Sequence, residues 1–147
     1  MYESGEAQAR AEAARDAMYA GDRVAHELGM IVSAVGPGTA TVDMTVTETM
    51  CNGLDTCHGG IIFSLADAAM AFASNGHGGS HVASHASIDW LAPARPGDEL
   101  VATATHAGGD GRSKLWNVEV RGPNGLVAAF RGMTKMVSTD GPAPAPT

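Results

Sequence analysis

The sequence predicts an α+β fold in which a long antiparallel sheet wraps around one central helix. Six segments alternate apolar and polar residues with the period of half-buried strands. One segment between the second and third of these strands has helical spacing and is small or apolar almost all round, so it must be covered on most sides. A chain of 147 residues is the size of one domain with a single core. A sheet curled around the helix satisfies all three observations.

The N-terminal part is expected to hold a surface helix followed by two strands. Residues 5–20 are rich in alanine, glutamate and arginine, which favour a helix, and Gly21-Asp22 ends it. Residues 26–36 and 39–49 are predicted to be strands, joined by the turn sequence Gly-Pro-Gly at 36–38.

The rest of the chain is predicted to be one buried helix and four strands. The helix covers 58–76 and stops at a glycine. The four strands are expected at 81–92, 98–107, 114–121 and 126–137, with short breaks that suit an antiparallel meander. Residues 1–137 therefore form one domain, and the proline- and alanine-rich segment 138–147 is expected to be a disordered tail.

Composition and charge exclude several classes of protein. No apolar run approaches the roughly 20 residues of a membrane helix, and the acidic N-terminus does not resemble an export signal. A cytoplasmic location with reduced thiols is therefore expected. The net charge of −7 argues against general nucleic-acid binding. Residues 1–90 carry most of the excess acids, while 91–147 hold six basic residues against five acidic ones, which leaves room for a patch that binds phosphates.

The stretch CNGLDTCHGG contains residue types of metal and thiol sites, but neither chemistry is expected. Cys51, Cys57 and His58 lack the short cysteine pairs of a zinc site. His81 and His85 lie in a predicted strand, where four residues span about 13 Å, so one ion cannot bind both. Cys57 stands at a helix start, which can activate a thiol, but the adjacent imidazole points away from it, so a small buried filler is the favoured interpretation.

Gly59 and Gly60 open the buried helix, although glycine costs roughly 0.5–1 kcal/mol against alanine in a helix interior. Two explanations fit this placement. Free N–H groups at a helix start can hold a carbonyl oxygen that becomes an oxyanion. Alternatively, the helix end packs closely on the sheet.

Asp67 is the only charged residue between His58 and Gly76, in a helix expected to be buried. Such a carboxylate is costly unless it has a function, or a partner N–H or arginine from the sheet. It lies eight residues beyond Gly59, about 12 Å along the same helix. If both act on one group, Asp67 must therefore come from a second chain, and a symmetric dimer would carry two shared sites.

The pattern N-G-x-x-x-x-H-G-G-x-x-x-x-L-x-D, from Asn52 to Asp67, resembles the hot-dog-fold acyl-CoA thioesterases, most closely the PaaI-type branch of phenylacetate degradation. The stretches HGGIIFSLADAAMAFASNG, ASIDWLAPARPGDELVATA and VAAFRGMTK are also similar to that branch, and the likeness covers residues 24–137. The resemblance implies a hot-dog fold and the hydrolysis of small acyl-CoA thioesters, with phenylacetyl- and hydroxyphenylacetyl-CoA as candidate substrates.

The resemblance also implies a role for each residue of the motif. Gly59 would supply the backbone N–H that polarises the thioester carbonyl, and Asn52 would hold the carbonyl or the attacking water. Asp67 of the neighbouring chain would be the nucleophile or the general base. His58 would support the loop and form a hydrogen bond near the thioester.

Three further residues are candidates for substrate binding: Gly60, Ser87 and Met70. Gly60 shares the helix start with the carbonyl site. Some related thioesterases carry serine or threonine where this chain has Ala83, and Ser87 would lie on the same face of a regular strand. Met70 could line an acyl pocket, although core packing is the alternative.

The expected partners are the substrate and further copies of the chain. Coenzyme A enters with the substrate, and its phosphates could meet Arg95, Arg112 or Lys114 near predicted loop or strand ends. No metal and no redox cofactor is expected. A dimer is the smallest assembly with a complete site, and the family precedent implies a homotetramer.

Two other functions stay open at this stage. A hot-dog dehydratase or hydratase would need an acid and a histidine placed together, whereas His58 and Asp67 are nine residues apart on one element. A non-catalytic acyl-CoA-binding protein would bind its ligand equally well after Asp67→Asn. The sequence leaves the acyl group, the assembly mode and the choice between nucleophile and general base undecided.

Overall fold

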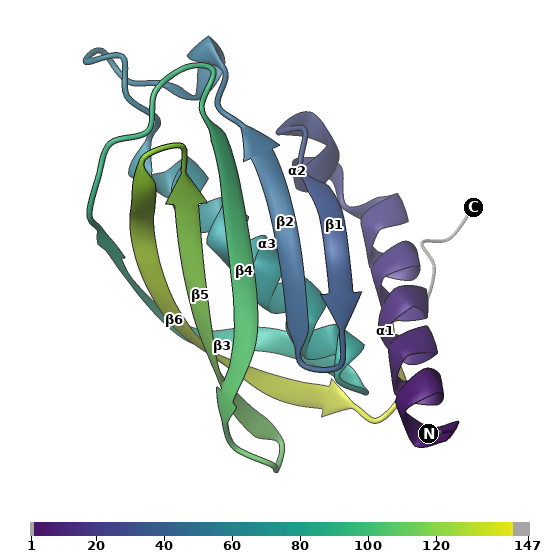
Figure 1. Cartoon of the computed structure of the whole chain (residues 1–147). Helices are drawn as coiled ribbons and strands as arrows, with labels where there is room; N and C mark the ends of the chain where they lie inside the picture. The colour runs from purple at the N-terminus through teal and green to yellow at the C-terminus, as the bar shows by residue number, and fades with distance from the viewer. Residues whose placement is uncertain (1, 143–147) are drawn as a thin grey trace.

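The computed structural model describes residues 2–142 and consists of one curled sheet, a central helix and an N-terminal helix (Figure 1). The described elements, in chain order, are α1 (Tyr2–Gly21), α2 (Arg23–Glu27), β1 (Ile31–Gly36), β2 (Thr39–Thr45), the 3-10 turn η1 (Glu48–Met50), α3 (Gly59–Gly76), β3 (Ser80–Trp90), β4 (Glu99–Gly108), β5 (Ser113–Gly122) and β6 (Gly125–Ser138). The expected architecture, an antiparallel sheet around one helix, is confirmed.

The order of strands in the sheet is β1-β2-β4-β5-β6-β3, and every neighbouring pair is antiparallel. The four strands were expected to form a meander, and this prediction is wrong for the connection from β3 to β4. Strand β3 lies at the edge beside β6, and residues 91–98 carry the chain across to β4, which pairs with β2. Alternation of side chains is a local property and does not encode which strands become neighbours.

The strand expected at 26–36 begins late because a short helix comes first. Asp22, which was expected to end the first helix, is the N-cap of α2, and its Oδ1 accepts from the Ala25 N–H at 3.0 Å. Gly29, with φ of 68°, turns the chain out of this helix. The next expected strand, 39–49, is also shortened, because its last residues form η1.

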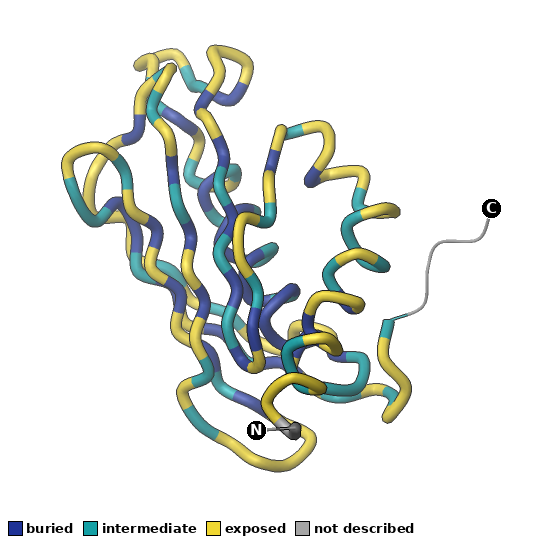
Figure 2. The backbone as a smooth tube through the Cα atoms, turned by 45° about the vertical axis from the view of Figure 1, so that its right-hand side comes forward, coloured by how far each residue is buried: buried dark blue, intermediate teal, exposed yellow. Residues whose placement is uncertain are grey.

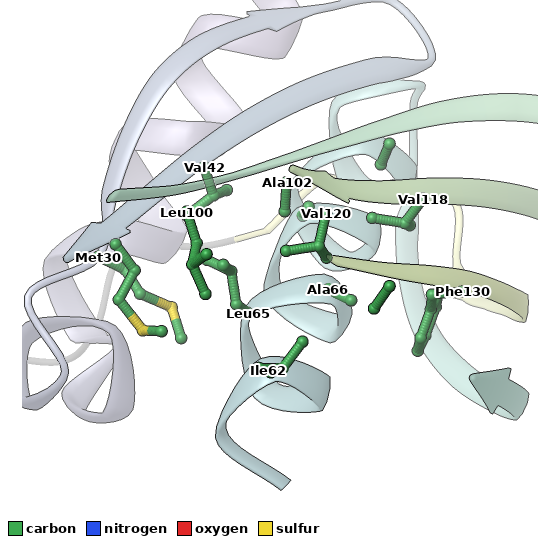
Figure 3. Close-up of a cluster of buried hydrophobic side chains, with 14 of the residues drawn as sticks. Met30, Val42, Ile62, Leu65, Ala66, Leu100, Ala102, Val118, Val120 and Phe130 are labelled. Carbon is green, nitrogen blue, oxygen red and sulfur yellow. The ribbon is translucent and has the colours of Figure 1, made fainter. Parts of the chain in front are cut away.

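The core lies between α3 and the concave face of the sheet. Ile62, Leu65 and Ala66 of α3 face the strands in Figure 3. Their partners there are buried apolar residues of β2, β4, β5 and β6, including Val42, Leu100, Ala102, Val118, Val120 and Phe130. Burying a side chain of this size stabilises the fold by roughly 1.5–3 kcal/mol, so the apolar face of α3 anchors the helix to the sheet.

Helix α1 covers one edge of the sheet and one end of α3, and its outer side is exposed (Figure 2). The Gln8 amide donates to the Val35 carbonyl of β1 at 2.9 Å, and the Tyr19 hydroxyl donates to the Met30 carbonyl at 2.8 Å. The β1 edge is therefore protected, whereas the outer edge of β3 has no neighbouring strand among residues 2–142.

The structure describes residues 138–142 of the segment that was expected to be a disordered tail. Ser138 ends β6, and the Ser80 hydroxyl donates to the Asp140 carbonyl at 2.7 Å. Residues 143–147 of the expected tail lie outside the described residues. None of the described helices is both long and apolar enough to cross a membrane.

Candidate active site

The loop before α3 is organised by the side chain of Asn52. Its Oδ1 accepts from the Leu54 N–H at 2.9 Å, the Thr56 N–H at 3.2 Å and the Thr56 hydroxyl at 3.1 Å. These three donors determine which end of the amide faces the loop. The Asn52 Nδ2 group has no acceptor in the described part of the chain, so it is free to donate to a ligand.

The first turn of α3 presents unpaired N–H groups. The His58 carbonyl accepts from the N–H groups of Ile61 and Ile62, at 3.0 and 3.2 Å. The N–H groups of Gly59 and Gly60 have no acceptor among the described residues, as expected at the first positions of a helix. Together with the partial positive charge of the helix start, they form a site for a carbonyl oxygen that gains negative charge.

His58 supports the loop through its main chain. Its N–H donates to the Met50 carbonyl at 2.9 Å, while its imidazole is exposed and forms no side-chain cap at the helix start. The imidazole is therefore available to a substrate or to a second chain.

A pocket of about 340 Å³ lies at the start of α3. Gly59 and Ile62 of α3 line it, together with Thr56, Cys57 and residues 90–94. A Cβ on Gly59 would lie 3.0 Å from the Trp90 ring, whereas a Cβ on Gly60 would meet nothing within 4 Å. Close packing therefore explains Gly59, and Gly60 lies in the open. Trp90 was not among the predicted site residues, because an aromatic residue at a strand end carries no distinctive signal.

Asp67 lies in a second depression, of about 300 Å³, between α2 and α3. Its carboxylate is half-buried and makes no hydrogen bond or ion pair with the described residues, so the sheet does not supply the partner considered above. Burial raises the pKa of Asp67, and the charge of Asp22 raises it further. A carboxylate with a raised pKa is a stronger base than an exposed one.

One chain does not bring the two groups together. Gly59 and Asp67 lie eight residues apart in the continuous helix α3, which separates them by about 12 Å along its axis. The pocket at the helix start and the depression around Asp67 have no lining residue in common.

Ser87 does not share the strand face of Ala83, because β3 is not regular. The register shifts between Ala83 and His85, so the strand gains one residue there. Ala83 is opposite the buried Thr134, while Ser87 is opposite the exposed Arg131. Residues directly opposite one another share a face of the sheet, so Ser87 lies on the outer face and Ala83, although exposed, lies on the face of Thr134.

The structure also locates Met70, the cysteines and the basic candidates. Met70 is buried in the core, where its sulfur fills the space beside Gly132, so it packs rather than lining either pocket. Burial raises the pKa of Cys57 to about 11, which keeps its thiol protonated at neutral pH. Lys114, expected near the surface, is buried, and its Nζ donates to the Gly111 carbonyl at 2.7 Å.

Arg95 and Arg112 are exposed, as a phosphate ligand must be. Among residues 4–142, no group of three or more histidine, cysteine, aspartate or glutamate side chains is placed to hold a metal ion.

Comparison with known proteins gives a consistent result. The family model of the thioesterase superfamily matches residues 54–129. The acyl-coenzyme A thioesterase PaaI of Escherichia coli is 42% identical over 122 residues, which cover 82% of this chain and 87% of the relative. The solved structure of the E. coli PaaI protein from the phenylacetic acid degradation operon superposes with a TM-score of 0.88 at 38% identity, covering 90% of this chain and 97% of that one. A mutant of phenylacetic acid degradation protein PaaI from Thermus thermophilus superposes with a TM-score of 0.76 at 33% identity, covering 79% and 100%.

Proposed function

This chain belongs to the thioesterase superfamily and is an acyl-CoA thioesterase of the hot-dog fold, and we propose that it hydrolyses small acyl-CoA thioesters at a site shared between two subunits. Phenylacetyl- and hydroxyphenylacetyl-CoA are the first candidate substrates, by likeness to the PaaI proteins. The observation that carries the shared site is the separation, within one helix, of the unpaired N–H groups at Gly59 from the unpartnered carboxylate of Asp67.

The carbonyl site consists of the N–H groups of Gly59 and Gly60 and the Nδ2 group of Asn52. None of these donors has an acceptor in the described chain, so none must give up a bond to receive the thioester oxygen. As the carbonyl carbon becomes tetrahedral, its oxygen gains negative charge, and donors already in place stabilise that charge without rearranging. Loss of one such donor typically lowers the rate by about 10²–10³-fold.

Asp67 of the adjacent subunit supplies the second function. As a general base, it takes a proton from water while the water oxygen bonds to the carbonyl carbon; the C–S bond then breaks and the proton passes to the sulfur of coenzyme A. As a nucleophile, a carboxylate oxygen of Asp67 bonds to the carbonyl carbon and the C–S bond breaks, so that coenzyme A leaves as a thiolate that takes up a proton. Water then opens the resulting anhydride, which releases the free acid and restores the Asp67 carboxylate. Single-turnover hydrolysis in heavy-oxygen water separates these routes, because only direct attack places solvent oxygen in the Asp67 carboxylate. Both routes consume water alone, so we propose that no metal or redox cofactor is needed.

The edge strand β3 is the candidate dimer contact. It is 11 residues long, and its outer edge has no neighbouring strand among residues 2–142. Val82 and Trp90 on this strand are each about half exposed. A long uncovered edge pairs readily with another strand, and two-fold pairing of β3 would join two sheets and bring their central helices together. A tetramer of two such dimers, and a cytoplasmic location, stay predictions from the resemblance.

The first experiment measures thiol release from phenylacetyl-, hydroxyphenylacetyl-, benzoyl- and straight-chain acyl-CoAs. We expect Asp67→Asn to lower the rate at least a hundredfold, because each 1.36 kcal/mol of lost transition-state stabilisation costs about tenfold. Asp43→Asn, the same chemical change on β2, is the matched control and should retain activity. Equal activity of wild type and Asp67→Asn would contradict the role of Asp67, and binding without turnover in both would favour an acyl-CoA-binding protein.

Subunit mixing tests whether the site is shared. Asp67→Asn is expected to be inactive because it lacks the carboxylate. Gly59→Ala is expected to be inactive because its Cβ would press on the Trp90 ring and displace the donors at the helix start. A mixed dimer contains one site with an intact Gly59 and an intact Asp67 from opposite chains. Random mixing of equal amounts should therefore restore about a quarter of wild-type activity, because half of the dimers are mixed and each has one working site. Absence of restored activity, with mixed dimers confirmed by mass spectrometry, would place each site within one chain.

A further inference from the structure

Trp90, the last residue of β3, contacts Gly59, the first residue of α3. Its indole Nε1 donates to the Gly59 carbonyl at 3.1 Å. A Cβ on Gly59 would lie 3.0 Å from Cε2 and 3.1 Å from Cζ2 of the same ring. We propose that Trp90 is a positioning residue for the carbonyl site. Trp90 holds the Gly59–Gly60 peptide in place and makes the Gly60 N–H a stronger donor. The inference rests on the proposed thioesterase function.

The hydrogen bond from Trp90 to the Gly59 carbonyl also affects the Gly60 N–H. The Gly59 carbonyl and the Gly60 N–H belong to one planar peptide group. A donor on the oxygen draws electron density toward it, which makes the N–H at the other end a stronger donor, as in any chain of coupled hydrogen bonds. The Gly60 N–H has no acceptor in the described chain, and a Cβ on Gly60 would meet nothing within 4 Å, so this gain is available to a substrate oxygen.

The position of Trp90 is set by the sheet rather than by a loose loop. Trp90 is paired with the buried Ala128 of β6. The next two N–H groups, of Leu91 and Ala92, both donate to the Val127 carbonyl, at 2.8 and 3.2 Å. The backbone around the indole is therefore held by hydrogen bonds to β6, and the hydrogen bond from the indole to the Gly59 carbonyl restrains the start of α3.

The same contact explains why the first helical position is glycine. A Cβ at position 59 would lie 3.0 Å from the ring, closer than an ordinary contact, so the ring would have to shift, whereas position 60 has room for a side chain. Trp90 and Gly59 therefore form a matched pair, and both residues line the pocket.

The test replaces Trp90 by Phe, which retains an aromatic ring and removes the indole N–H. We expect kcat for phenylacetyl-CoA to fall three- to tenfold while KM stays within twofold of wild type. Trp116→Phe is the matched control, because it removes the other indole N–H, which donates to the Thr134 hydroxyl at 2.8 Å inside the core. That control should lower Tm and leave kcat unchanged. A change in KM alone, or an unchanged kcat, in Trp90→Phe would overturn the positioning role.

A thermal double-mutant cycle tests the contact without any assay of activity. Gly59→Ala should lower Tm by several degrees in the wild-type background and by clearly less in a Trp90→Ala background, where the ring is gone. Additive losses would overturn the Trp90–Gly59 contact. The two proposals fail separately: a wild type that releases no coenzyme A from any thioester contradicts the function, while an Asp67-dependent enzyme whose Trp90→Phe variant keeps full kcat contradicts only the positioning role.

Discussion

The side chain of Asn52 has both a structural role and a proposed chemical role. Its Oδ1 accepts three hydrogen bonds from the loop, while its Nδ2 group remains free among the described residues. A single residue therefore shapes the loop with its acceptor and offers a donor to the substrate. The two tasks can be separated by substitution, because aspartate retains the acceptor and loses the donor.

We expect Asn52→Asp to fold like wild type but to hydrolyse acyl-CoA at least tenfold more slowly, because a second carboxylate oxygen repels a developing oxyanion. Asn52→Ala loses the loop contacts as well, and should be less stable by roughly 1–3 kcal/mol. Thermal unfolding and thiol release measured on both variants check this. An Asn52→Asp enzyme with wild-type kcat would contradict the donor role.

At the scale of elements, three histidines lie near the C-terminal end of α3, far from the carbonyl site. His77 caps α3, His81 lies near the start of β3, and His106 lies on β4. The rings of His77 and His106 stack with their centroids 5.1 Å apart. Burial lowers the pKa of His77 most, the charges of His106, Lys114 and His81 lower it further, and Asp110 opposes them.

His81 is the more buried member of this group. Burial lowers its pKa most, and Lys114 adds to that effect, while the hydrogen bond between its Nε2 and the Gly78 carbonyl, at 2.7 Å, acts in the opposite direction. Its Nδ1 is buried and has no partner among the described residues. A proton on this ring is therefore disfavoured in the folded chain.

His77 and His81 should make the fold less stable in mild acid. The pKa values of these two residues are lower in the folded chain than the ordinary 6.5, so the unfolded chain binds more protons as the pH falls below that value. Their contribution is complete above about pH 6.5 and is lost on acidification. Urea unfolding at pH 8.0 and 5.5 should show a lower midpoint at pH 5.5, and a smaller difference in the double variant His77→Gln/His81→Gln.

His85→Gln provides the control for this measurement, because His85 is exposed on the outer face of β3. It should leave the pH dependence unchanged. A midpoint that is equal at the two pH values in wild type would contradict the lowered pKa values of His77 and His81.

At the scale of the whole molecule, the two edges of the sheet differ in protection. Helix α1 covers β1, while β3 is uncovered in the described chain. An uncovered edge exposes backbone donors and acceptors that a second strand can satisfy. If that pairing completes the active site, activity and assembly must be lost together.

We expect the double variant Val82→Lys/Ser84→Lys on β3 to shift the protein toward monomers and to lower activity in proportion, because charges on an edge oppose strand pairing. Both positions are exposed, so the chain itself should fold. Ile31→Lys/Ser33→Lys on β1 is the matched change at the protected edge and should keep both assembly and activity. Sedimentation and thiol release on the same samples decide the matter; a fully active monomer would contradict the shared site.

Local sequence patterns were enough to predict the six strands, the central helix and the N-terminal helix, but not the short helix α2. Side-chain periods of two and of 3.6 residues depend on neighbouring residues alone, so the six strands and the central helix were predicted within a few residues. The spacing from Gly59 to Asp67 likewise placed the helix-start donors and the carboxylate about 12 Å apart, because a helix has a constant rise per residue.

The strand order, the outward position of Ser87 and the contact of Trp90 with Gly59 were set by tertiary packing. The bulge between Ala83 and His85 reverses the face of every later residue in β3, and no local pattern indicates it. Trp90 reaches Gly59 across 31 positions of chain. Such contacts depend on which surfaces the folded sheet brings together, and that information belongs to the whole chain rather than to any one segment.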